Sequence, residues 1–275
     1  MTLTAASVVA LAGAGAVGVR TLITRQAAIA RRRIGKPLGE QALDADRVWR
    51  RKKHPGRPVE LLLLGDSIAA GLGAAHRRDT LGARLAKGIA RAEERPVRLR
   101  TAAIVGSETS ALERQVSALP AEYRPDVAVI VVGGNDVTHR IPVARSAEQL
   151  EQIVAAMRGR GVPVVVGTCP DLGTLRAIPQ PLRALAARSS RQLAAAQAGA
   201  VHRAGGRVVA LARAVGPVFA ERPDEMFSVD RFHPSALGYR RTAEALLPAV
   251  LAALEAVPDS GRTTTGPRAH LRAER

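Results

Sequence analysis

Three short stretches of the chain carry the kinds of residue that together perform nucleophilic catalysis. Ser67 follows an apolar run, Asp230 and His233 stand three positions apart, and Asn135 follows two glycines. A serine hydroxyl becomes a strong nucleophile when a histidine takes its proton, and a carboxylate can hold that histidine in position. An asparagine amide can donate a hydrogen bond to the oxyanion that forms on a carbonyl under attack. These residue types predict acyl transfer by a serine, provided that the fold brings them together.

Ser67 lies near the end of the stretch Val-Glu-Leu-Leu-Leu-Leu-Gly-Asp-Ser-Ile, residues 59–68. The apolar run has the length of a buried strand and stops at Gly65. Open α/β sheets bind their ligands outside the carboxyl ends of the strands, where this serine would stand. A serine in a turn is also common as a helix N-cap. The Gly-x-Ser-x-Gly elbow of the α/β-hydrolases is absent, since residues 65–69 read Gly-Asp-Ser-Ile-Ala.

His233 is the candidate base, and Asp230 is the group that would orient its ring. The spacing of three, with proline directly after the histidine, predicts a tight loop before the last helix. An isolated Asp-x-x-His pattern is typical of a surface turn, so the pair indicates catalysis only in combination with the other two stretches. The remaining histidines, at positions 54, 76, 139, 202 and 270, lack such a context, although His139 is close enough to Asn135 to line a pocket.

Asn135 stands in the stretch Gly-Gly-Asn-Asp, residues 133–136, at the end of a strongly apolar run. The two glycines allow backbone and ligand to approach closely, and the amide could then donate to an oxyanion. The alternative is an ordinary turn asparagine. Gly106 follows the second predicted strand and could add a backbone N–H from the same rim of the sheet.

Strand and helix patterns alternate from Val59 onward. Strands are predicted at residues 59–64, 97–103, 127–132, 162–167 and 207–211. Helices are predicted near residues 80–92, 109–119, 146–159 and 181–204, and a last helix from Ser235, a candidate N-cap, to about Ala256. Such alternation predicts a parallel sheet with right-handed crossovers. We therefore expect an α/β fold, with a three-layer α/β/α sandwich and a five-stranded parallel sheet in a domain of residues 59–257.

The four blocks together resemble the SGNH hydrolases, also called the GDSL esterase and lipase family. The Gly-Asp-Ser block is residues 65–67, the Gly-x-Asn-Asp block is 133–136 and the Asp-x-x-His block is 230–233. The glycine block resembles residues 103–109 around Gly106, and Ile68 stands where the family name has leucine. The resemblance spans about residues 59–255. It implies a flavodoxin-like sandwich that needs no metal or cofactor. It also implies an oxyanion hole from the N–H groups of Ser67 and Gly106 and the Asn135 side chain.

The predicted function is that of a serine esterase, which hydrolyses lipid or short-chain acyl esters through an acyl-enzyme intermediate. The same site would serve a carbohydrate O-acetylesterase, and the preferred acyl-chain length would separate the two. A catalytically idle domain that binds a ligand or partner at a membrane is a further alternative, but it would not need all four site residues together. A phosphate-binding flavodoxin-like domain would leave Asp230 and His233 unexplained, and the chain has no Walker-type lysine.

The net charge of +17 could indicate a nucleic-acid partner, but its distribution argues against one. Residues 1–57 carry 12 Lys and Arg against 3 Asp and Glu, so the excess belongs mostly to an N-terminal appendage. Cys169 is the single cysteine, which excludes an internal disulfide. We do not expect it to act as a second nucleophile, because no histidine pairs with it in sequence. The apolar loop after it, residues 170–179, is predicted to shape the acyl or alcohol pocket.

Residues 1–19 carry no charge, and basic residues follow them as far as Lys36. Residues 1–34 are therefore a candidate membrane anchor or a surface helix, and residues 1–36 would favour anionic lipid headgroups. Positive charge after the apolar stretch orients the catalytic domain to the cytoplasmic side. A cleavage-like Ala-Leu-Ala at residues 10–12 keeps secretion as an alternative, beside a cytoplasmic protein. Residues 35–58 are expected to form a short helix and a basic linker, and residues 258–275 a disordered tail.

Overall fold

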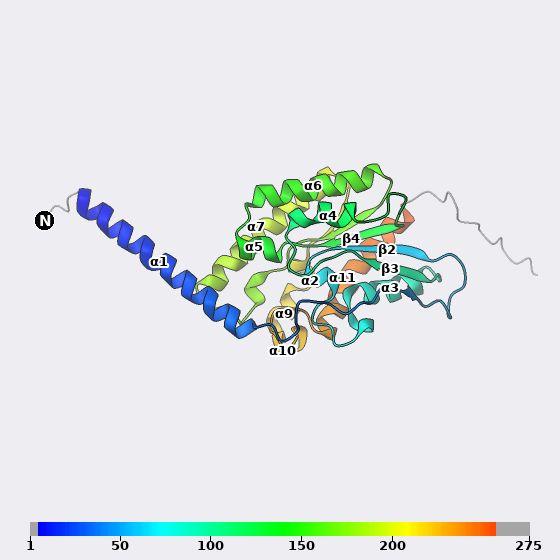
Figure 1. Cartoon of the computed structure of the whole chain (residues 1–275), viewed down its shortest axis with the longest axis horizontal. Helices are drawn as coiled ribbons and strands as arrows, with labels where there is room; N and C mark the ends of the chain where they lie inside the picture. The colour runs from blue at the N-terminus through cyan, green and yellow to red at the C-terminus, as the bar shows by residue number, and fades with distance from the viewer. Residues whose placement is uncertain (1–4, 257–275) are drawn as a thin grey trace, which may run out of the picture.

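Residues 5–256, the part of the chain that the computed structural model describes, form a six-stranded sheet between layers of helices (Figure 1). The strand order is β1-β3-β2-β4-β5-β6. Five strands run parallel, as predicted: β2 (Val59–Gly65), β3 (Val97–Thr101), β4 (Val127–Val131), β5 (Val164–Gly167) and β6 (Arg207–Val209). The α/β sandwich is confirmed, and the strand count is one higher than expected.

The additional strand lies in the segment 35–58, where we expected a short helix. β1 (Val48–Trp49) pairs with β3 in the antiparallel direction and forms one edge of the sheet. The Asp46 carboxylate accepts a hydrogen bond from the N–H of Thr101 at 2.9 Å, and the Trp49 ring packs against the core. A two-residue strand carries too little pattern to be predicted from sequence, so only these tertiary contacts define it.

The four adjacent leucines of β2 show why this sheet needs helices on both faces. Side chains alternate along a strand, so Leu61 and Leu63 face one layer, whereas Leu62 and Leu64 face the other. All four are completely buried. A continuous apolar run of this kind is typical of parallel strands that are covered on both sides.

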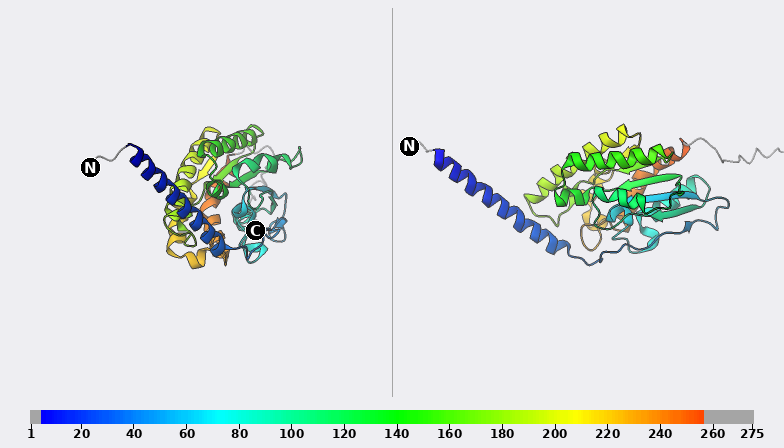
Figure 2. Two further views of the ribbon diagram at one scale, coloured as in Figure 1. Left: turned by 60° about the vertical axis from the view of Figure 1, so that its left-hand side comes forward. Right: turned by 45° about the horizontal axis from the view of Figure 1, so that its top comes forward.

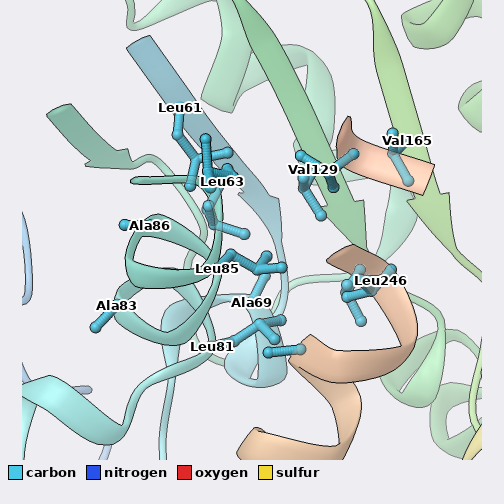
Figure 3. Close-up of a cluster of buried hydrophobic side chains, with 14 of the residues drawn as sticks. Leu61, Leu63, Ala69, Leu81, Ala83, Leu85, Ala86, Val129, Val165 and Leu246 are labelled. Carbon is cyan, nitrogen blue, oxygen red and sulfur yellow. The ribbon is translucent and has the colours of Figure 1, made fainter. Parts of the chain in front are cut away.

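Helices α3 (Leu81–Ala92) and α11 (Ala236–Glu255) cover the face of Leu61 and Leu63, where Leu85 and Leu246 complete the core (Figure 3). The opposite face is covered by α4 (Leu112–Ser117), α6 (Val143–Gly159) and α7 (Leu182–Arg203). Ser235 caps α11 as predicted, because its Oγ accepts the N–H groups of Leu237 and Gly238 at 3.2 Å each.

Several short helices escaped prediction because four to six residues cannot display a helical period. They are α2 (Ser67–Ala70), α5 (Gly134–His139), α8 (Leu211–Ala214), α9 (Gly216–Glu221) and α10 (Pro223–Met226).

The N-terminal helix α1 (Ala5–Ile34) reaches outward from the sandwich and meets it with its C-terminal half (Figures 1 and 2). Among the described residues, no helix combines the length and the apolar character needed to cross a membrane. The tail of residues 258–275, for which we expected disorder, lies outside the described residues.

Candidate active site

Ser67 is the first residue of α2 and lies directly beyond the end of β2. Gly65 makes this turn with a φ of +129°, and a Cβ at that position would come within 1.9 Å of the Val131 carbonyl oxygen. Only glycine can therefore occupy the end of the strand. Asp66 is the N-cap of α2 and accepts a hydrogen bond from the Ile68 N–H at 2.9 Å. The turn at Gly65 and the N-cap at Asp66 therefore fix the backbone position of Ser67 at the start of α2.

His233 joins Ser67 to Asp230, although 166 residues separate the serine from the histidine. The Ser67 Oγ lies 2.9 Å from His233 Nε2, and His233 Nδ1 lies 2.5 Å from Asp230 Oδ2. The geometry suits a ring whose Nδ1–H donates to the carboxylate while Nε2 accepts from the serine hydroxyl. Ser67 and Asp230 are 6% and 3% exposed, so both hydrogen bonds are shielded from water.

The loop between α10 and α11 presents the histidine in this position. Asp230 Oδ1 accepts the N–H groups of Phe232 and His233 at 3.0 Å each, and Arg231, which directly follows Asp230, has a left-handed φ of 57°. Burial alone would raise the pKa of the Asp230 carboxyl, but the His233 ring and the two N–H groups outweigh it and hold the pKa below its ordinary value. The carboxylate is therefore kept in the charged form that orients the ring.

Asn135 lies on α5, directly after β4, and lines the same pocket as Ser67 and His233. Its Nδ2 donates to the Ser107 carbonyl at 2.9 Å. An amide nitrogen carries two hydrogens, so a second donor remains for a ligand. Gly133 precedes it with a φ of +131°, and a Cβ there would come within 3.0 Å of Cys169 Cβ. The glycine thus lets α5 start close against the neighbouring strand end.

Gly106 lies in the exposed turn after β3, with a φ of +81°, and is outside the set of residues that line the pocket of Ser67. Its role in the oxyanion hole stays a prediction. The same turn touches Asn135 through its neighbour Ser107.

A buried glutamine that sequence analysis missed holds this turn against the nucleophile strand. Gln115, on α4, accepts from the Gly65 N–H at 2.9 Å and donates to the Gly65 carbonyl at 2.8 Å. The same Nε2 lies 3.4 Å from Ser107 Oγ. Gln115 is only 2% exposed, but sequence gives no signal for its burial, because the residue is polar and its partner Gly65 lies 50 residues away.

Asp136, the next residue after Asn135, anchors α5 to two neighbouring segments. Its carboxylate is buried and accepts hydrogen bonds from the Thr109 N–H at 3.0 Å and from the Ser146 hydroxyl at 2.6 Å. These contacts join α5 to the segment after β3 and to α6. The Asn-Asp pair therefore has two separate duties, since one side chain faces the pocket and the other ties three segments together.

Asp66 is fully buried beside the site, and burial raises the pKa of its carboxyl to about 6, although the N–H of Ile68 and the nearby His233 favour the charged form. A raised pKa in the folded state means that this group destabilises the fold as the pH rises from about 4 to 6, because the unfolded chain loses the proton first.

The variant Asp66→Asn keeps a capping oxygen but cannot titrate. We expect its stability relative to wild type to increase by roughly 2–3 kcal/mol between pH 4 and pH 7. Thermal or urea unfolding at several pH values measures this difference, with Asp224→Asn at an exposed position as the control. A difference that does not change with pH would contradict the raised pKa.

The pocket beside Ser67 has mainly apolar walls. The large side chains that line it come from α2, α8 and α9 and from the loops that follow β5 and α10: Ile68, Leu172, Leu175, Leu211, Phe219 and Phe227. The predicted loop after β5 does contribute, through Leu172 and Leu175. The contributions of α8 and α9 were not predicted.

Cys169 is buried behind this pocket. Its backbone N–H donates to Gln197 Oε1 at 2.7 Å, and burial raises the pKa of its thiol well above the ordinary value. A thiol of this kind is inert at neutral pH because the thiolate is the nucleophilic form.

The chain is similar to known proteins in both sequence and fold. The model of the GDSL-like Lipase/Acylhydrolase family matches residues 63–241. The GDSL-like esterase Rv1075c of Mycobacterium tuberculosis is 41% identical over 265 residues, which cover 90% of this chain and 84% of that protein.

Solved structures share the fold at lower identity. The lipase/acylhydrolase from Enterococcus faecalis is 23% identical, with a TM-score of 0.57, and the match covers 70% of this chain and 95% of that one. The crystal structure of TesA is 23% identical, with a TM-score of 0.59, and the match covers 70% of this chain and 99% of that one.

Proposed function

This chain is a carboxylic ester hydrolase of the GDSL-like lipase and acylhydrolase family, and we propose that it works by covalent catalysis at Ser67. The observation that carries the proposal is the position of the His233 ring, which lies within hydrogen-bond distance of both Ser67 and Asp230. A serine, a base and a group that orients the base are the parts that activate a hydroxyl nucleophile.

The reaction proceeds in two acyl transfers. The Ser67 Oγ attacks the ester carbonyl while His233 Nε2 takes the hydroxyl proton, and Asp230 stabilises the imidazolium that forms. The tetrahedral intermediate then collapses, the C–O bond of the ester breaks, and His233 protonates the departing alcohol. Water attacks the acyl-enzyme in the same way, with His233 as base, and releases the acid and the free Ser67 hydroxyl.

We assign the oxyanion hole to the Asn135 side chain and the backbone N–H groups of Ser67 and Gly106. Asn135 supports this assignment because it shares the pocket with Ser67 and retains a second amide hydrogen. Donors that are fixed before the reaction stabilise the charge that develops on the oxygen without reorganisation. The hydrogen bond from Asn135 to Ser107 fixes this donor and links it to the turn of Gly106.

The apolar pocket supports acyl esters as substrates, either of lipids or of shorter chains. Buried methylene groups contribute roughly 0.8 kcal/mol each, so kcat/KM for p-nitrophenyl esters is expected to rise about fourfold with each added carbon until the pocket is filled. Initial rates with the acetate, butyrate, hexanoate and octanoate measure this profile. A clear preference for acetate would instead support the O-acetylesterase alternative.

We also propose that residues 1–36 associate with an anionic membrane surface. Val17, Val19 and Leu22 on α1 are 66%, 62% and 45% exposed, and the exposed Arg20 and Arg25 lie among them. Exposed apolar and basic side chains on one helix suit the headgroup region of a bilayer. Positive charge after the uncharged stretch favours the cytoplasmic leaflet.

Flotation with lipid vesicles tests the membrane proposal. The full chain is expected to float with phosphatidylglycerol-containing vesicles and to bind at least tenfold more weakly to pure phosphatidylcholine, because each basic residue near an anionic surface contributes about 1 kcal/mol. Changing Arg20, Arg25 and Arg31 to glutamine should reduce the binding, and the same number of changes at Arg51, Lys52 and Lys53 is the control. Binding that ignores lipid charge would contradict the proposal.

A further inference from the structure

We propose that α1 braces the wall of the ester-binding pocket, and that Gln26 and Ala30 thereby influence which acyl chains the enzyme accepts. The inference rests on the proposed function for its catalytic consequence, but its structural part stands on contacts alone. α1 lies outside residues 63–241, which the family model matches, so the brace is an addition to the shared domain.

Gln26 forms a two-point contact with a single short backbone segment. Its side-chain amide donates to the Gln180 carbonyl, and its Oε1 accepts from the Leu182 N–H at 2.9 Å. Leu182 is the first residue of α7, whose own N-cap is Pro181 and supplies no side-chain hydrogen bond. Gln26 is 7% exposed and provides the missing capping oxygen from another helix. This contact requires a side chain with both a donor and an acceptor, which the glutamine amide provides.

Ala30 lies one helical turn after Gln26 on the same face of α1. It belongs to a buried cluster with Leu172, Leu175 and Ile178 and is 7% exposed. Arg33 continues this face, with its guanidinium 3.5 Å from the Ala177 carbonyl. The C-terminal half of α1 thus lies along residues 172–182, which connect β5 to α7, and it meets the body at the start of α7 (Figure 1).

The braced segment also forms a wall of the active-site pocket. Leu172 and Leu175 line that pocket with Ser67, while they pack in the cluster that contains Ala30. Phe227 and Phe232 are partly buried against the same cluster and line the same pocket. Two of the side chains that would contact an acyl chain are therefore held from behind by α1.

Loosening the brace should affect the acyl pocket more than the reacting groups. Ser67 is fixed by the end of β2, and His233 is fixed by the loop of Asp230, so neither depends on α1. Residues 172–182 would instead sample more conformations. A less ordered wall offers a long acyl chain fewer fixed contacts, whereas an acetyl group would hardly reach it.

The test compares Gln26→Ala with Gln41→Ala in the full chain, because Gln41 is exposed. A second pair, Ala30→Asp with Ala92→Asp, probes the apolar contact, because Ala30 is buried whereas Ala92 is exposed. Thermal unfolding identifies any variant that fails to fold. We expect Gln26→Ala to raise KM for the p-nitrophenyl octanoate about five- to tenfold, with the acetate changed less than twofold. Hydrogen exchange at residues 172–182 should also become faster.

The exchange measurement separates the inference from the proposed function, because it requires no turnover. Faster exchange in an enzyme without esterase activity would support the brace and reject the proposed function. Unchanged exchange in a folded Gln26→Ala protein would overturn the brace. Equal losses with acetate and octanoate would overturn its role in acyl-chain selection.

Discussion

Replacing Ser67 by alanine is expected to lower kcat for a p-nitrophenyl ester by roughly 10⁴-fold or more. The substitution removes the oxygen that lies 2.9 Å from His233 Nε2 and that would form the acyl-enzyme. Substrate binding should change little, because the walls of the pocket remain. Initial rates at saturating substrate measure the loss, and KM reports the binding.

The histidine supplies the companion experiment. His233→Ala should cost about as much as Ser67→Ala, and the double variant should lose little more than either one, because residues that act as a unit are not additive. Ser110→Ala, at an exposed position, is the matched control and should retain wild-type turnover. A Ser67→Ala protein with near-normal kcat would remove the proposed mechanism, and additive losses would mean that the two residues act in separate steps.

Asn135→Ala is expected to lower kcat on the order of 10²–10³-fold, which is the usual cost of one oxyanion donor. KM should stay within about threefold, since the developing charge exists only in the transition state. Asn135→Asp has the same shape but replaces the donor with a second acceptor, so it should be at least as damaging. Steady-state kinetics on both variants measure the effect.

The structure offers a way to separate catalysis from positioning at this residue. Asn135 also holds the Ser107 carbonyl, so a variant could act by displacing the turn of Gly106. Ser107→Ala keeps the carbonyl that Asn135 binds, so its kcat should change little in either case. If Asn135→Asp acts only by displacing the turn, its unfolding temperature should fall together with its kcat. A higher KM with an unchanged kcat in Asn135→Ala would contradict the role of this residue as an oxyanion donor.

Sequence alone predicted the parallel sheet because its central strands are nearly continuous apolar runs that alternate with helical patterns. β2 and β4 are buried on both faces, and such runs have few other structural solutions. The order of the elements then places the carboxyl ends of neighbouring strands at one edge of the sheet. Ser67 and Asn135 follow those ends, so their proximity could be predicted before any distance was known.

The distances themselves could not be predicted. His233 reaches Ser67 because the Asp230 carboxylate accepts two backbone N–H groups and Arg231 adopts a left-handed conformation, neither of which has a signal in the residue pattern. The short helices that supply Leu211 and Phe219 to the pocket lack a detectable period for the same reason.

Buried polar residues were the other omission. Gln26 and Gln115 are polar, so a pattern of apolar positions assigns them to the surface, yet both are less than a tenth exposed. Both side chains are hydrogen-bonded to backbone groups, which lie 50 residues away for Gln115 and more than 150 residues away for Gln26. Burial of a polar side chain requires hydrogen-bond partners, and only the folded structure identifies them.

Labelling with a fluorophosphonate probe tests covalent catalysis at Ser67 most directly. Purified full-length protein is reacted with the probe, and the modified peptide is identified by mass spectrometry beside the variants Ser67→Ala and His233→Ala. We expect one adduct per chain, located on Ser67, no adduct in Ser67→Ala and much slower labelling in His233→Ala. An adduct on another residue, or a folded wild type that hydrolyses esters without labelling at Ser67, would contradict it.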